Sequence, residues 1–282
     1  MNQNNLSLSH SNVAPQSFKL PLPSLVLYIV FFLFLFGVAV SLFILVVVHN
    51  PLFFLCLLFL FGVTAALILW NSFSLRNNRT ILHYLHSLPD SDLTVAHHGQ
   101  LVKITGHVSC GNVSLESSYE KVGRCVYTST LLFECGKLGL KPVDVKESCF
   151  GWRLAYAERL STDFYISDKN SGIRALVKAG PDSRVIPLIT ESRLVTTTKN
   201  CKVLASHLRK WLRDRNLSSE ARLLRLEEGY IKEGSSLSVF GILQRNSDFM
   251  VVTPPQELIS TGCLWKKLLL PVDVNGLILA IP

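Results

Sequence analysis

Charged side chains are missing from two long stretches near the N-terminus of this chain, and no acidic residue occurs among residues 1–79. Residues 24–48 and 52–70 contain no Asp, Glu, Lys or Arg, and 20 residues of the first stretch are Leu, Ile, Val or Phe. As helices they would reach roughly 37 and 28 Å, against a hydrocarbon core of about 30 Å. Buried core helices would show a polar stripe or charged ends. We therefore predict a transmembrane hairpin over residues 24–70, turning at residues 49–51.

A cleaved signal peptide is the other structure that such an N-terminal stretch can form. The first stretch is too long for a typical signal-peptide core, and no small-residue cleavage motif follows it. A second apolar stretch begins three residues later. We expect both spans to remain in the mature protein.

Lys and Arg are also absent from the turn of the hairpin, whereas Lys19, Arg76 and Arg79 flank its other ends. The positive-inside rule then places both termini in the cytosol, at the plasma membrane or an endomembrane. The cysteines after the hairpin lack the tight spacing of a disulfide framework, which agrees with a reducing compartment. Glycosylation sequons at Asn78, Asn112 and Asn216 would then stay unmodified.

Small residues recur within the hairpin. Gly37 with Ser41, and Gly62 with Ala66, have the small-xxx-small spacing that lets helix backbones approach closely. We expect packing within the hairpin, and as the alternative a homo-oligomer contact. No ionisable residue lies in either span, which argues against a transporter.

The rest of the chain divides by composition. Residues 1–23 are an Asn-, Ser- and Pro-rich tail that we expect to be disordered, and residues 71–98 form a juxtamembrane linker with a short helix over 80–88. From residue 99 the pattern alternates, so residues 99–282 are predicted to form a cytosolic, β-rich α+β domain. The spacing Gly99 to Gly106 is repeated from Gly234 to Gly241, which we interpret as two related small-barrel strands. The domain is expected to consist of two small-barrel-like halves. Further strands are expected near 101–108, 124–133, 152–159, 163–167, 173–177, 185–198, 236–244 and 249–252, with a last hairpin over 268–274 and 277–281.

Two helices are expected inside this domain, over residues 202–215 and 219–228. The first is amphipathic and basic. We interpret it as a domain helix with a solvated basic face, and as the alternative a helix that lies on anionic headgroups. The basic residues concerned are Lys202, Arg209, Lys210, Arg213 and Arg215.

Motifs of catalysis and cofactor binding are nearly absent. The chain contains no G-x-S-x-G, H-E-x-x-H, Walker A, G-x-G-x-x-G or C-x-x-C motif, so we predict no catalytic residue and no cofactor. His83 and His86 have helical i, i+3 spacing but no further ligand at metal-site spacing, so no metal site is predicted. Cys125 or Cys149 with His207 is the remaining possibility for a thiol nucleophile. No RNA-binding motif or zinc finger supports a nucleic-acid partner.

Three segments carry a resemblance to a known family. They are residues 111–130, which include Arg124-Cys-Val-Tyr, residues 163–178, which include Asp163-Phe-Tyr-Ile-Ser-Asp, and residues 228–246, which include Val239-Phe-Gly-Ile-Leu. They resemble plant two-span membrane proteins of the SHOU type, also labelled uncharacterized membrane proteins or ubiquitin-specific protease-related. Some members restrain delivery of cellulose synthase to the plasma membrane and carry a long cytosolic N-terminal region, where this chain has a short tail. A segment around residues 115–127 is more faintly similar to a mitochondrial ubiquitin ligase, whose RING this chain lacks.

The sequence thus predicts a multi-pass membrane protein whose cytosolic domain binds an unidentified protein partner or the lipid bilayer. The expected function is non-enzymatic regulation of membrane trafficking or exocytosis. The alternative is a cysteine hydrolase of the ubiquitin-processing class.

Overall fold

The computed structural model describes residues 24–49, 51–76, 78–137, 141–142, 151–197, 204–218, 223–246, 249–262 and 267–282. The chain divides into two compact units. A helical unit holds Ser17–Pro89 and Gln256–Asn275, and a β unit holds Asp90–Pro255 and Gly276–Pro282. The sequence-based boundary at residue 99 placed residues 256–275 in the β-rich domain, whereas the structure groups them with the helices.

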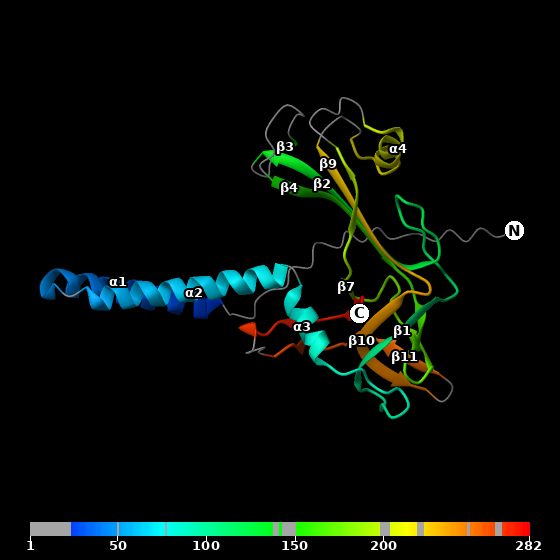
Figure 1. Cartoon of the computed structure of the whole chain (residues 1–282), viewed down its shortest axis with the longest axis horizontal. Coiled ribbons are helices and arrows are strands. Elements are labelled where there is room, and N and C mark those ends of the chain that lie inside the picture. The colour runs from blue at the N-terminus through cyan, green and yellow to red at the C-terminus, as the bar shows by residue number, and fades with distance from the viewer. Residues whose placement is uncertain are drawn as a thin grey trace. The chain divides into compact units, whose positions relative to one another are not determined.

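The helical unit consists of α1 (Ser24–Val48), α2 (Leu52–Arg76), α3 (Arg79–Ser87) and a small ladder of β12 (Ile259–Ser260) with β13 (Asp273–Val274) (Figure 1). The rings of Phe34 and Phe61 stack between α1 and α2 with centroids 4.8 Å apart. Among the residues described, one candidate membrane span is found, Leu52–Leu75 of α2, and none of its most apolar window is buried. The apolar stretch Phe31–Val47 of α1 is shorter. The predicted short helix is confirmed as α3.

Five strands of the β unit close into a barrel. These are β1 (Leu101–Cys110), β5 (Phe164–Asp168), β6 (Arg174–Val177), β11 (Met250–Thr253) and β10 (Ser236–Arg245), and β10 pairs again with β1. Every neighbouring pair is antiparallel except β6 with β11. If these five strands are numbered 1 to 5 in chain order (β1, β5, β6, β10, β11), their order around the barrel is 1-2-3-5-4-1. This is the topology of an OB-type barrel. Strands β14 (Leu277–Ala280) and β7 (Val185–Leu188) extend the sheet beyond β10.

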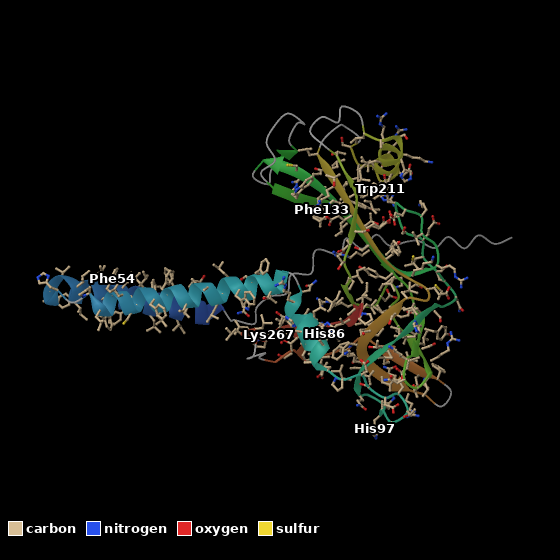
Figure 2. The ribbon with its side chains drawn as sticks, viewed as in Figure 1. Phe54, His86, His97, Phe133, Trp211 and Lys267 are labelled. Carbon is tan, nitrogen blue, oxygen red and sulfur yellow. The ribbon has the colours of Figure 1, made fainter. Side chains whose placement is uncertain are left out.

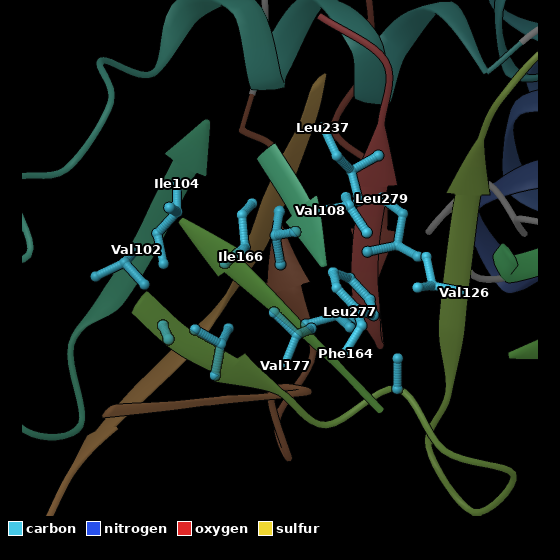
Figure 3. Packing of buried hydrophobic residues seen from close by; sticks show 14 of the residues in the cluster. Val102, Ile104, Val108, Val126, Phe164, Ile166, Val177, Leu237, Leu277 and Leu279 are labelled. Atoms are coloured by element: carbon cyan, nitrogen blue, oxygen red, sulfur yellow. The ribbon is translucent and has the colours of Figure 1, made fainter. Parts of the chain in front are cut away.

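Alternating aliphatic residues fill the barrel, as Figure 3 shows from close by. Val102, Ile104 and Val108 of β1 point inward, because every second side chain of a strand faces the same side. They pack in one buried cluster with members of the facing strands, among them Phe164, Ile166, Val177, Leu237, Leu277 and Leu279. The period-two pattern that predicts a strand over 101–108 therefore agrees with the burial along β1.

The glycine repeat has a structural counterpart. Gly99 and Gly234 precede β1 and β10, and both adopt positive φ angles, 81° and 84°. Gly106 and Gly241 lie where backbone or side chains of a neighbouring strand leave no room for a Cβ. Since β1 and β10 pair within one barrel, the interpretation of the repeat as two small-barrel strands is confirmed, whereas the expected two barrel-like halves are wrong.

A second sheet is built from chain inserted between the barrel strands. It contains β2 (Cys125–Lys137), β3 (Lys141–Pro142), β4 (Gly151–Ser161), β8 (Ser192–Thr196) and β9 (Leu224–Lys232), and helix α4 (Ser206–Asp214) belongs to the same insertions. The β2–β9 ribbon joins both cores, because Val126 and Ile231 lie in the barrel cluster while Leu132 and Leu226 lie in the cluster of α4.

Two sequence-based elements are wrong. The helix expected over 219–228 is strand β9 from Leu224 onward, whose burial alternates and which pairs with both β2 and β8. The final hairpin over 268–281 is also absent. Val274 pairs back to Ile259 in the helical unit, whereas β14 joins β10 and β7 in the β unit.

Candidate functional site

The two faces of the second sheet differ in chemistry. Leu132, Leu224 and Leu226 point to the face that packs against α4, where Leu208, Trp211 and Leu212 are buried. Arg225 and Glu227 alternate with those leucines along β9 and so lie on the opposite face. Figure 2 labels Phe133 and Trp211, one residue from each side.

On the α4 face a polar cluster surrounds Trp211. The indole Nε1 donates to Ser118 Oγ at 3.1 Å, and the Arg215 guanidinium lies 4.4 Å from the Trp211 ring centroid. Arg215 also forms a half-buried ion pair with Glu158 at 3.1 Å. These contacts attach α4 to the sheet, so we assign the cluster a structural role.

Those contacts also decide how the predicted basic helix is oriented. Its apolar face is directed into the domain, where Leu208 and Leu212 are buried, and is therefore occupied by protein. Arg209 donates to the Leu204 carbonyl at 3.3 Å, whereas Lys210 and Arg213 are exposed. Lys202 lies outside the residues that the structure describes.

On the other face, Phe133, Trp152 and Arg225 form what we call the Arg225 platform. The guanidinium lies 4.6 Å from the Phe133 ring centroid and 4.9 Å from that of Trp152. Register brings these residues together, because Phe133 of β2 is paired with Arg225 of β9 and Trp152 of β4 with Cys135 of β2. Trp152 keeps 39% of its surface exposed.

One acidic neighbour, Glu227, forms an ion pair with the guanidinium of the platform. Glu227 Oε1 lies 2.9 Å from Arg225 Nε, and the exposed Arg193 approaches the same oxygen at 3.8 Å. A cation held between two aromatic rings loses little conformational freedom when a partner binds. The platform therefore presents a preorganised aromatic and cationic surface.

A smaller pair of the same kind lies on the outside of the barrel. The Arg174 guanidinium of β6 stacks 4.8 Å from the ring centroid of Tyr165 on β5. Arg174 is exposed and Tyr165 is half-buried. It is a second, smaller aromatic and cationic surface of the β unit.

The two free thiols described in the β unit, Cys110 and Cys125, do not resemble nucleophiles. Cys125 is fully buried, and burial raises the pKa of its thiol, whereas a nucleophilic cysteine needs a lowered pKa. Burial, followed by the negative charge of Glu233, raises the pKa of Cys110. The His207 ring packs edge-on against Tyr119 at 4.5 Å. Cys149 lies outside the described residues.

Cys135 is disulfide-bonded, which the cysteine spacing had not suggested. Disulfides persist mainly in oxidising compartments. The bond therefore argues against the reducing compartment that the cysteine spacing indicated.

The small residues of the hairpin do not all meet. A Cβ on Gly37 would lie 3.3 Å from Leu57 of α2, and Ser41 is buried, so this pair faces α2. Gly62 and Ala66 are exposed, and a Cβ on Gly62 would have no neighbour within 4 Å.

On α3, His83 and His86 are exposed, and no cluster of three metal-binding side chains occurs in the described parts of the chain.

Comparison with known proteins gives one informative match. A protein of Arabidopsis thaliana, named an uncharacterized membrane protein, is 42% identical over 257 residues, which cover 91% of this chain and 54% of the relative. This chain is similar to a plant membrane protein. It spans about half the length of that curated relative. No protein-family model and no solved structure matches the chain.

The match agrees with the candidate span in α2, and together they support a membrane location. The name of the relative specifies no activity, partner or compartment. Sequence reasoning missed the Arg225 platform, because its residues come from three separate strands. The available signal was the alternation of Leu224, Arg225, Leu226 and Glu227, which was interpreted as helical.

Proposed function

We propose that the chain is a membrane-anchored, non-enzymatic regulator whose β unit binds another protein through the Arg225 platform. The observation that carries this proposal is the exposed Trp152 beside the Arg225 guanidinium. Trp and Arg are enriched among the residues that supply most binding energy at protein interfaces. A role in membrane trafficking, including delivery of cellulose synthase, is the finer part of the proposal and rests on the resemblance to SHOU-type proteins.

The proposal includes the topology of the anchor. We infer that α1 and α2 both cross the membrane as a hairpin, because α1 is a 25-residue helix without a charged residue. Arg76 and Arg79 follow the second span, and the turn between the helices has no Lys or Arg. By the positive-inside rule, the β unit then lies in the cytosol.

Alanine at the platform should remove binding. Trp152→Ala and Arg225→Ala in the full chain are each expected to weaken the partner by about 30-fold, since a hot-spot residue contributes about 2 kcal/mol or more. Proximity labelling from the β unit in intact plant cells measures the effect as the loss of the most enriched neighbours. Phe249→Ala, which truncates an exposed aromatic residue elsewhere on the β unit, is the matched control. Unchanged neighbours for both platform variants, at normal protein abundance, would refute the site.

Glycosylation tests the sidedness. Asn112 and Asn216 are exposed, so both sequons are sterically available. With the β unit in the cytosol, glycosidase treatment of protein from plant cells should leave its mass unchanged. A glycan on either asparagine would place the β unit on the opposite side of the membrane, where the Cys135 disulfide would persist.

A further inference from the structure

The end of α2 is joined to a segment near the C-terminus. Trp70 Nε1 donates to the Lys267 carbonyl at 3.2 Å. The Asn71 side chain makes two more bonds to this segment: its Nδ2 donates to the Leu268 carbonyl at 3.1 Å, and its Oδ1 accepts from the Leu270 amide at 2.7 Å. Asn71 thus pairs with the segment as a strand edge would. We call residues Lys267–Val272 the C-terminal arm (Figure 2, label Lys267).

These bonds set the depth of the arm along α2. Trp70 and Asn71 both lie within the candidate span Leu52–Leu75. With a rise of 1.5 Å per residue, Asn71 lies roughly 7 Å before Arg76, the first charged residue after the span. The arm therefore lies beside the last apolar turns of the span. Trp side chains concentrate at this level of membrane proteins, where hydrocarbon meets headgroups.

Buried and exposed side chains alternate along the arm. Leu269 and Val272 are buried, whereas Leu268 and Leu270 keep 60% and 39% of their surface exposed. Leu258, in the same unit, is exposed as well. The sequence from 258 to 272 contains no acidic residue, and Lys267 is exposed. Exposed leucines beside a lysine at the end of a span suit the headgroup region of a bilayer.

The backbone at Leu268 gives an independent indication. Its φ angle is 53°, in the left-handed region where Gly or Asn is the usual residue. A leucine there is strained, and the Asn71 bond to its carbonyl helps to hold it. Strain of this kind concentrates at functional positions, and here it falls on a leucine that keeps 60% of its surface exposed.

We propose that the C-terminal arm is a second membrane contact, in which Leu268 and Leu270 insert into the interface of the bilayer that α2 crosses. The occupant of this apolar surface is lipid, because the arm continues the lipid-exposed surface of α2. The Trp70–Asn71 pair positions the arm. The C-terminal chain is thereby attached to the membrane without a further span.

Photocrosslinking to lipid tests the proposal in the full chain. A benzoyl-phenylalanine is placed at Leu268, at Leu60 in the middle of α2, or at Val95, an exposed residue of the β unit. The protein is then reconstituted in nanodiscs of phosphatidylcholine and phosphatidylserine and irradiated. We expect lipid adducts at 268 to approach those at 60 and to exceed those at 95 severalfold. Asn71→Leu should lower the yield at 268 and leave that at 60 unchanged.

The adducts at 268 test the membrane contact of the arm, and the adducts at 60 test the span. A yield at 268 no higher than at 95, or adducts at 268 to a protein chain, would overturn the membrane contact. Loss of adducts at 60 would instead overturn the span itself. Should Asn71→Leu fail to accumulate, the comparison of 268 with 95 in the otherwise native chain still decides the proposal.

Discussion

Glu228→Ala should destabilise the β unit by about 4 kcal/mol or more, since each hydrogen bond to a charged group contributes about 1.5–3 kcal/mol and loses its acceptor here. Glu228 is only 1% exposed. Its carboxylate accepts from the amides of Tyr119 and Glu120 at 2.8 and 3.0 Å and from Thr130 Oγ1 at 3.0 Å. Alanine would leave these donors unpaired inside the protein, which is why the cost exceeds that of an average substitution.

Thermal unfolding of the full-length protein in detergent measures this effect. Glu228→Gln keeps one acceptor oxygen and should lose about half as much stability. Glu116→Ala is the control, because that side chain is exposed and lies 3.9 Å from Lys121, so its removal should change stability by less than about 1 kcal/mol. A melting temperature for Glu228→Ala equal to that of Glu116→Ala would show that the carboxylate does not hold the loop before β2.

Gly106→Ala is expected to have the second-largest effect. A Cβ at this position would lie 2.0 Å from the Ser167 carbonyl oxygen and 2.7 Å from its carbon, both in the backbone of β5. Because the pairing of Gly106 with Asp168 helps to close the barrel, the strands cannot separate without losing ladder hydrogen bonds. We expect a loss of about 3 kcal/mol or more, the upper range for overpacking.

The matched control is Gly123→Ala in the loop before β2. A Cβ there would meet no atom within 4 Å, so the control should keep nearly the native melting temperature. For a unit of this size the expected loss at Gly106 corresponds to a decrease of about 6–12 °C. Equal melting temperatures for the two variants would contradict the close approach of β1 and β5.

The elements that could be predicted from the sequence are those in which local pattern and tertiary environment agree. Strands β1 and β5 alternate between buried and partly exposed positions, and α3 and α4 show helical spacing. In β9 the local sequence pattern and the tertiary environment disagree, because the spacing of Leu223, Leu226 and the adjacent charged residues also fits a helix. Pairing with β2 and β8 decides the strand, and a single sequence does not contain that pairing.

The last hairpin fails for a different reason. Asn275-Gly276 is a strong turn signal, but Gly276 has a φ of 137° and lies against the Arg184 carbonyl. At this point the chain leaves the helical unit and enters the β unit, and it does not turn back on itself. The Arg225 platform had no motif, since register between β2, β4 and β9 creates it. The adjacent Glu227 and Glu228 could not be distinguished from the sequence either. Glu227 pairs with Arg225 on the platform, whereas Glu228 is buried on the other face of the sheet. Only knowing which residues of β9 face each side separates the two roles.

The attachment of Asn71 to the C-terminal arm has a consequence for biosynthesis. Its partner Leu268 follows 197 residues later in the chain. At about 5–20 residues per second, a ribosome needs roughly 10–40 s to reach it after Asn71 has been made. During that interval the side-chain amide of Asn71 lies at the membrane interface without its partners in the C-terminal arm. Maturation of the anchor is therefore delayed until the segment that contains Leu268 has been translated.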